Sequence, residues 1–153
     1  HKFPFDNEEY DVLISNEVFE HIFNLEEILG EINRVVKMGG ELLITVPFVW
    51  DEHEQPYDFA RYSSYGLTFL LEKYGFEVVE FNKSNNSLAV VFQLFNDYIY
   101  KKLIRRGRRI NRFFVNFLCA INNIIGLIAC LITPKNNDLY LDNIVLAKKV
   151  KQV

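Results

Sequence analysis

The sequence between Tyr10 and Phe48 has the pattern of one strand–helix–strand unit, which restricts the possible folds more than any other segment. The apolar run within Tyr10–Asn16 is typical of a strand that is buried on both faces. An amphipathic helical segment follows, and a second apolar run at 41–46 ends at Pro47. Because a crossover helix joins parallel strands, we expect an α/β fold.

The helix between these strands has recognisable end signals. Asn24 and Glu27 have the spacing of a capping box, so we expect the helix to begin near Asn24. Lys37 suits its last turn, and Gly39 or Gly40 supplies the left-handed residue that ends it.

The rest of the chain is predicted to alternate helices and strands, without an internal repeat. Ser63 or Ser64 caps a helix that ends at Gly75. The later elements are expected to be a strand at 76–81, a helix at 88–104, a break at 105–109, a helix at 110–132 and a strand at 139–148.

Polar residues directly follow the first strand, where ligands bind in open α/β sheets. Asn16 and Glu17 can hydrogen-bond an amino or hydroxyl group, and Val18 can pack on a flat ring. The alternative is that Glu17 and Glu20 only favour a helix N-terminus and that His21 is a packed histidine.

Neither the cysteines nor the histidines indicate a metal site. Cys119 and Cys130 are eleven residues apart on one expected helix, about 16 Å along its axis, so they cannot bridge each other. We expect free, buried thiols of a reducing compartment. His21, His53 and Glu54 lack the short spacing of metal ligands, so we expect no metal there.

Five short motifs resemble the later half of class I S-adenosylmethionine-dependent methyltransferases. These motifs are Phe3-Pro4-Phe5-Asp6-Asn7, Tyr10-Asp11-Val12, Glu17-Val18-Phe19-Glu20-His21, Val36-Lys37-Met38-Gly39-Gly40-Glu41-Leu42 and Val46-Pro47. The segment up to Phe81 fits the family pattern less specifically. Within this family, the loop from Pro47 to Tyr65 is similar to that of small-molecule methyltransferases of surface-polysaccharide biosynthesis.

The resemblance implies the later half of a Rossmann-like methyltransferase sheet, with a helical hairpin inserted before the last, antiparallel strand. Residues 1–153 would form one partial methyltransferase domain, with the insertion at about 86–132 and the final strand at about 139–148. The implied cofactor is S-adenosylmethionine. Its glycine-rich loop would lie upstream of His1, and Asn16–His21 would be the part of the cofactor wall present here, so we expect this chain alone to bind it weakly or not at all.

The loop from His53 to Tyr62 would carry the catalytic residues. Methylation of a hydroxyl group needs a base, and His53 is the best candidate because imidazole titrates near neutrality. Tyr57, Asp58 and Arg61 would hold a polar or anionic acceptor. The alternative is that Asp58 and Arg61 pair with each other and that Tyr62 fills the core.

The segment Lys101–Ile132 joins a basic cluster to a long apolar run. Residues 1–80 contain 5 Lys/Arg and 17 Asp/Glu, whereas residues 81–153 contain 12 and 3. The uncharged run Phe113–Ile132 would measure about 30 Å as a helix, enough to span a bilayer. A span would separate the last strand from its sheet. We therefore expect a hairpin packed on the domain or in a homodimer, or an anchor on an anionic membrane surface. Aromatic residues at helical spacing argue against nucleic-acid binding.

We therefore predict a methyltransferase that is cytoplasmic or peripheral at the inner face of the membrane. It would transfer a methyl group from S-adenosylmethionine to a small-molecule, sugar- or lipid-linked acceptor. The alternative is a non-catalytic membrane-surface or partner-binding module with a degenerate methyltransferase fold.

Overall fold

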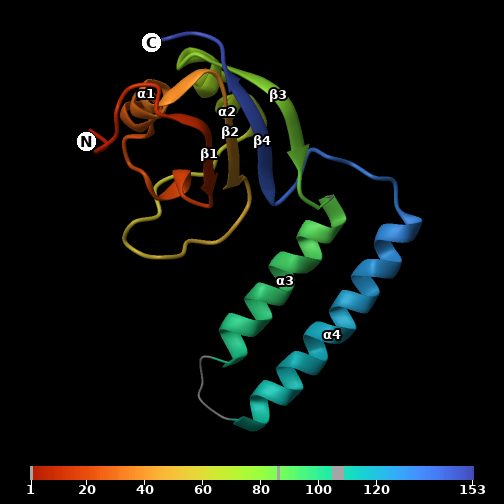
Figure 1. The fold of residues 1–153 in the computed structure, drawn as a ribbon. Helices are drawn as coiled ribbons and strands as arrows, with labels where there is room; N and C mark the ends of the chain where they lie inside the picture. The colour runs from red at the N-terminus through yellow and green to blue at the C-terminus, as the bar shows by residue number, and fades with distance from the viewer. Residues whose placement is uncertain (1, 86, 105–108) are drawn as a thin grey trace. The chain divides into compact units, whose positions relative to one another are not determined.

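The computed structural model describes residues 2–85, 87–104 and 109–153 (Figure 1). It divides into two compact units, of which the first contains residues 1–84 and 141–153 and the second contains residues 85–140.

A mixed four-stranded sheet forms the first unit within the described residues. Its strands are β1 (Tyr10–Asn16), β2 (Val36–Pro47), β3 (Phe76–Lys83) and β4 (Asp142–Lys149). The strand order is β1-β2-β4-β3; β1 runs parallel to β2, and β4 is antiparallel to β2 and β3 (Figure 1). Ile14 of β1 lies opposite Leu43 of β2. The expected α/β fold with an antiparallel last strand is therefore confirmed.

Helices cover one face of this sheet. α1 (Leu25–Val35) and α2 (Ser64–Lys73) contribute apolar side chains to the same core as β2 and β4. The central side chains of this core are almost completely buried, and they include Leu29, Ile32, Leu42, Ile44, Leu67 and Leu71.

The opposite face of β1 is exposed. Val12 and Ile14 are 51% and 68% exposed, whereas the next residue, Ser15, is buried. The expectation that β1 is buried on both faces is therefore wrong for the part of the chain that the structure describes. Alternate side chains of a strand point to opposite faces, and the described helices cover only one of them.

α1 begins at the expected place, but its first turn is not capped as expected. The helix starts at Leu25, and the Nδ2 atom of Asn24 donates to Oε2 of Glu27 at 2.9 Å. The Asn24 side chain caps no backbone N–H group. The predicted capping box is therefore wrong.

The predicted end of α1 is also wrong. The helix ends at Val35, and residues 37–40 are an irregular stretch of β2 across which the pairing with β1 shifts register. Gly39 has a φ angle of +76°, and a Cβ atom on Gly40 would lie 2.9 Å from the carbonyl oxygen of Asp11. The two glycines therefore serve a bulge in a strand and not a helix cap.

The remaining signals of the first unit predicted its elements closely. The Oγ atom of Ser63 accepts the N–H group of Gly66 at 3.2 Å, which confirms the cap of α2. Gly75, just after this helix, has a φ angle of +79°. β3 extends to Lys83 instead of residue 81, and β4 begins at Asp142 instead of residue 139.

Two hydrogen-bonded residues mark where the chain leaves and re-enters the first unit. The backbone N–H group of Ser84 donates to the carbonyl of Asp142 at 3.0 Å, and the Ser84 hydroxyl donates to Oδ2 of Asp142 at 2.6 Å. The N–H group of Leu141 donates in return to the carbonyl of Ser84 at 3.1 Å.

The second unit is a pair of helices, as expected. It contains α3 (Ser87–Ile104) and α4 (Arg109–Ile132). The expected break at 105–109 falls mostly on residues 105–108, which lie outside the described residues. Among the described part of the chain, the segment Arg112–Ile132 is the one helix long and apolar enough to cross a membrane. Cys119 and Cys130 are not bridged to each other, as predicted, but both are only partly buried, whereas buried thiols were expected.

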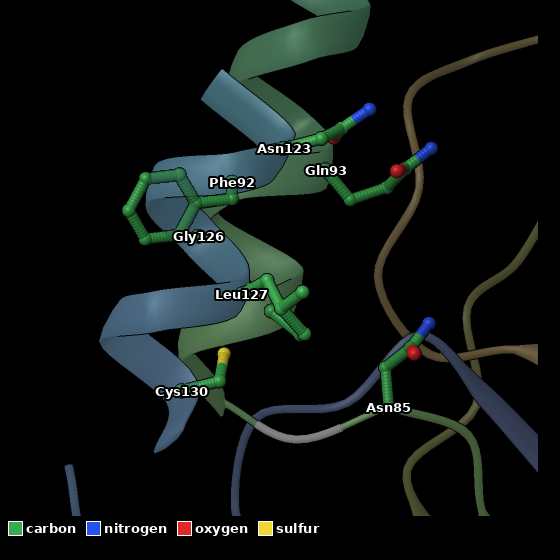
Figure 2. Close-up of a pocket in the computed structure, with 8 residues that line it drawn as sticks. Asn85, Phe92, Gln93, Asn123, Gly126, Leu127 and Cys130 are labelled. Carbon is green, nitrogen blue, oxygen red and sulfur yellow. The ribbon is translucent and has the colours of Figure 1, made fainter. Parts of the chain in front are cut away.

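Small and polar residues bring α3 and α4 together. Asn122 donates from Nδ2 to Oδ1 of Asn96 at 2.9 Å and to the carbonyl of Phe92 at 3.1 Å. A Cβ atom on Gly126 would lie 2.8 Å from Cγ of Phe92, so the helices approach closely there. Figure 2 shows the open groove of about 350 Å³ beside this approach, where Cys130 is one of the lining residues.

Candidate active site

The segment after β1 and the loop after β2 meet at the carboxyl ends of these strands (Figure 1). The Oγ1 atom of Thr45 donates to Oδ1 of Asn16 at 2.7 Å, and the N–H group of Glu17 donates to the carbonyl of Thr45 at 3.0 Å. These bonds fix the position at which the Asn16–His21 segment leaves the sheet.

A short 3-10 helix, η1 (Phe19–His21), follows and holds the loop at 48–62. The carbonyl of Glu20 accepts the N–H groups of Phe59 and Ala60 at 2.8 and 3.2 Å. The two segments predicted to carry functional residues are therefore hydrogen-bonded to each other.

His21 and His53 lie against each other across this junction. Their ring centroids are 4.8 Å apart, and the rings are nearly perpendicular. The Nδ1 atom of His21 lies 2.9 Å from the carbonyl oxygen of Tyr57, so the tautomer with hydrogen on Nδ1 donates to this carbonyl. The Nε2 atom then faces Oε1 of Glu20 at 3.6 Å.

Glu20 is the residue of this site that the sequence did not single out. Its side chain is 0% exposed, and neither carboxylate oxygen accepts a hydrogen bond from the described residues. Burial raises the pKa of the Glu20 carboxyl above its usual value. In the sequence, Glu20 looks like an acidic residue that favours the N-terminus of a helix. Only its position next to His21 could have indicated that it belongs to the site.

The potential metal ligands that lie together here are not the three residues that the sequence suggested for comparison, His21, His53 and Glu54. Among the described residues, Glu20, His21 and His53 each offer a ligand atom within 4.8 Å of the others. Glu54, which stands beside His53 in the sequence, is exposed and is not part of this group.

Asp58 and Arg61 are bound to each other. Nη1 and Nη2 of Arg61 donate to Oδ1 and Oδ2 of Asp58 at 2.5 and 2.7 Å. The Arg61 guanidinium holds the pKa of the Asp58 carboxyl well below its usual range. Asp58 also accepts the backbone N–H group of His53 at 2.9 Å. This pairing matches the structural alternative, and a role of either residue toward an acceptor stays a prediction.

Two other predicted site residues are open to solvent. Tyr57 is 65% exposed and Val18 is 45% exposed, and Val18 directly follows Asn16 and Glu17 at the end of β1. An apolar surface beside an amide group fits a flat ring that carries hydrogen-bonding atoms. The residues present therefore fit the adenine end of a nucleoside cofactor.

Comparisons with known proteins agree with the sheet topology. A family model described as "Methyltransferase domain" matches residues 1–44. A proposed sarcosine dimethylglycine methyltransferase from Galdieria sulphuraria has 18% identity and a TM-score of 0.55, over 98% of this chain and 57% of that one. Phosphoethanolamine N-methyltransferase 2 from Haemonchus contortus, solved with S-adenosyl-L-methionine, has 16% identity and a TM-score of 0.57, over 97% of this chain and 35% of that one.

The chain has the fold of a class I methyltransferase.

This methyltransferase fold also occurs in a protein named for another reaction. The [4+2]-cyclase SpnF has 16% identity and a TM-score of 0.54, over 97% of this chain and 52% of that one. The chain thus spans between 35% and 57% of the length of these three structures. No curated protein matches it. The fold alone therefore does not identify the reaction, which depends on the residues of the site.

Proposed function

We propose that this chain forms the C-terminal part of an enzyme that transfers a methyl group from S-adenosylmethionine to a small-molecule acceptor. The observation that carries the proposal is the meeting of His21 and His53 at the carboxyl ends of β1 and β2, within a methyltransferase fold. S-adenosylmethionine would supply an electrophilic methyl group. Asn16, Glu17 and Val18 would bind its nucleoside end, and His21 would complete this wall.

The exposed face of β1 supports the proposal that further elements of a larger domain pack against this strand. Val12 and Ile14 are apolar and open to solvent, and β1 forms one edge of the described sheet. Further strands and helices of a complete methyltransferase domain would pair with this edge and cover these side chains.

His53 is the proposed base for a hydroxyl acceptor. Its Nδ1 atom lies 3.2 Å from the carbonyl oxygen of Asp51 and 3.4 Å from Oδ2 of Asp58. Nη2 of Arg61 also lies 3.4 Å from this atom, but its two hydrogens are donated to the Asp51 carbonyl at 2.8 Å and to Asp58 at 2.7 Å. Two acceptors at this distance favour hydrogen on Nδ1, which leaves the Nε2 lone pair to accept a proton. In this proposal Asp58 and Arg61 hold His53 in place, and the exposed Tyr57 contacts the acceptor.

The helical pair favours an acceptor that is presented at a membrane, such as a lipid-linked sugar of surface-polysaccharide biosynthesis. Leu131 and Ile132 of α4 are 77% and 78% exposed, and Phe113 near the other end of the helix is also exposed. Lys101 and Lys102 of α3 are exposed cations, and Lys101 is paired with Asp97 at 3.0 Å. We propose that this apolar helix and nearby lysines contact the inner face of the membrane, with a homodimer as the alternative cover for the helix.

Two measurements on the full-length protein test methyl transfer. Calorimetry should detect S-adenosylmethionine binding by the full-length protein and weak or no binding by residues 1–153 alone. Changing His53 to Ala in the full-length protein should lower turnover roughly 100-fold while cofactor binding persists. Near-normal turnover of this variant would remove His53 from the proposed role.

The exposed α4 also supports a second candidate, a non-catalytic membrane-surface module. This candidate predicts that the full-length protein binds no S-adenosylmethionine but sediments with anionic phosphatidylglycerol vesicles. Binding of the cofactor by the full-length protein would exclude it.

A further inference from the structure

We propose that Glu20, His21 and His53 bind a divalent transition-metal ion at the carboxyl ends of β1 and β2. This proposal goes beyond methyl transfer and does not depend on it, because it rests only on side chains of this chain.

The three ligand groups already lie close to the spacing of a metal centre. All three ligand atoms are within 4.8 Å of one another, and Nε2 of His21 is 3.6 Å from Oε1 of Glu20. With metal–ligand distances of about 2.1 Å, two ligands of a tetrahedral ion are about 3.4 Å apart. The Glu20–His21 separation therefore already suits one edge of the polyhedron. The other separations, which are within 4.8 Å, would have to shorten to about 3.4 Å when the ion binds.

The buried Glu20 carboxylate is the strongest sign of a missing ligand. It is completely buried, and neither oxygen accepts a hydrogen bond from the described residues. A buried carboxylate is costly unless it is paired or coordinates a metal. The His21 imidazole at 3.6 Å is beyond hydrogen-bonding distance. An ion between them would satisfy the carboxylate.

Backbone carbonyls orient both imidazoles as metal sites require. Metal-binding histidines usually donate their second ring N–H group to a carbonyl or carboxylate. Nδ1 of His21 has the carbonyl of Tyr57 at 2.9 Å, and Nδ1 of His53 has the carbonyl of Asp51 at 3.2 Å. Nη2 of Arg61 lies 3.4 Å from the same His53 atom, but both of its hydrogens are donated to other acceptors at shorter distances. In these tautomers both Nε2 atoms carry a lone pair that can bind the ion.

The ligand set indicates which ions would bind. Two imidazole nitrogens and one carboxylate suit Mn²⁺, Fe²⁺, Co²⁺ or Zn²⁺ better than Ca²⁺, which takes six to eight oxygen ligands. Three protein ligands leave positions open for water or for an acceptor oxygen. If the ion is bound, His53 is one of its ligands, and its lone pair is not free to act as a base.

The experiment measures ion binding by residues 1–153 after treatment with a chelator. Titration with Co²⁺ should give one ion per chain, with the absorption bands of nitrogen and oxygen ligands and without the charge-transfer band that Cys119 or Cys130 would produce. Changing Glu20 to Gln, or His53 to Ala, should weaken binding at least tenfold. The matched control is Glu54→Gln, which removes an exposed carboxylate beside His53 and should leave the affinity unchanged.

Two results would overturn the proposal: no Co²⁺ binding by the chelator-treated chain, or equal affinity in the Glu20→Gln and His53→Ala variants and the unchanged chain. Circular dichroism checks that each variant is folded. His53 is partly exposed, so its substitution tests the site even if Glu20→Gln does not fold. The experiment measures ion binding in the absence of the cofactor. A negative result would therefore overturn the metal site without deciding whether the protein transfers methyl groups.

Discussion

Arg61 and Asp58 form a two-point ion pair inside the loop that follows β2, and the same carboxylate accepts the backbone N–H group of His53. The Asp58 side chain is almost completely buried, so the pair fixes the loop and the position of His53 together. Loss of one partner would leave a buried charge uncompensated.

Changing Arg61 to Ala should therefore lower the free energy of unfolding by about 3 kcal/mol. Chemical denaturation of the variant measures this change. The control is Lys73→Ala, because Lys73 pairs with Glu26 at the surface, and an exposed pair contributes less than about 1 kcal/mol. Equal losses in the two variants would show that the Asp58–Arg61 pair does not fix the loop.

Stability should depend on pH through Glu31 of α1. Hydrogen bonds from Arg34, and then from the backbone N–H group of Phe3, lower the pKa of Glu31 to about 2. A lowered folded-state pKa means that the stabilisation is complete above the usual value of 4.5 and is lost as the pH falls towards 2. The difference in unfolding free energy between the unchanged chain and Glu31→Gln should shrink over this range. A difference that stays constant from pH 6 to pH 2 would contradict this assignment.

Gly75 should tolerate no side chain. Its φ angle is +79°, and a Cβ atom there would lie 2.3 Å from the carbonyl oxygen of Lys151 and 2.8 Å from Nδ2 of Asn33. Gly75→Ala should lower the melting temperature, with a loss of about 1–3 kcal/mol. The matched control is Gly30→Ala in α1, where the nearest atom would be 3.9 Å away and helix propensity predicts a gain of about 0.5–1 kcal/mol.

The helical pair should depend on Asn122. This residue is nearly buried and donates to both Asn96 and the carbonyl of Phe92. Asn122→Ala leaves these acceptors without their donor and should destabilise the pair by about 1–3 kcal/mol, seen as faster amide hydrogen exchange in α3 and α4. Asn116→Ala, at an exposed position of the same helix, should change exchange little.

The elements that the sequence predicted well are those whose signals are local. The β1 bounds, the Ser63 cap and the two long helices depend on patterns within a few residues. The end of α1 was missed because a pairing between Val36 and Tyr10, distant in the sequence, overrides the helical signals of Lys37 and Gly39.

The candidate site was predictable in outline only. The carboxyl-end rule placed the segment after β1 and the loop after β2 at one edge, and the structure joins them there. The approach of Glu20 to His53 was not predictable, because 33 positions separate them and their meeting depends on hydrogen bonds from Phe59 and Ala60. The burial of Glu20 likewise depends on how the loop closes over η1.

Because Ser84 is hydrogen-bonded to Leu141 and Asp142, the chain leaves the sheet for α3 and returns from α4 at adjacent positions. A short turn between Ser84 and Leu141 would cost little chain entropy, so a chain in which such a turn replaces residues 85–140 should keep β3 and β4 paired.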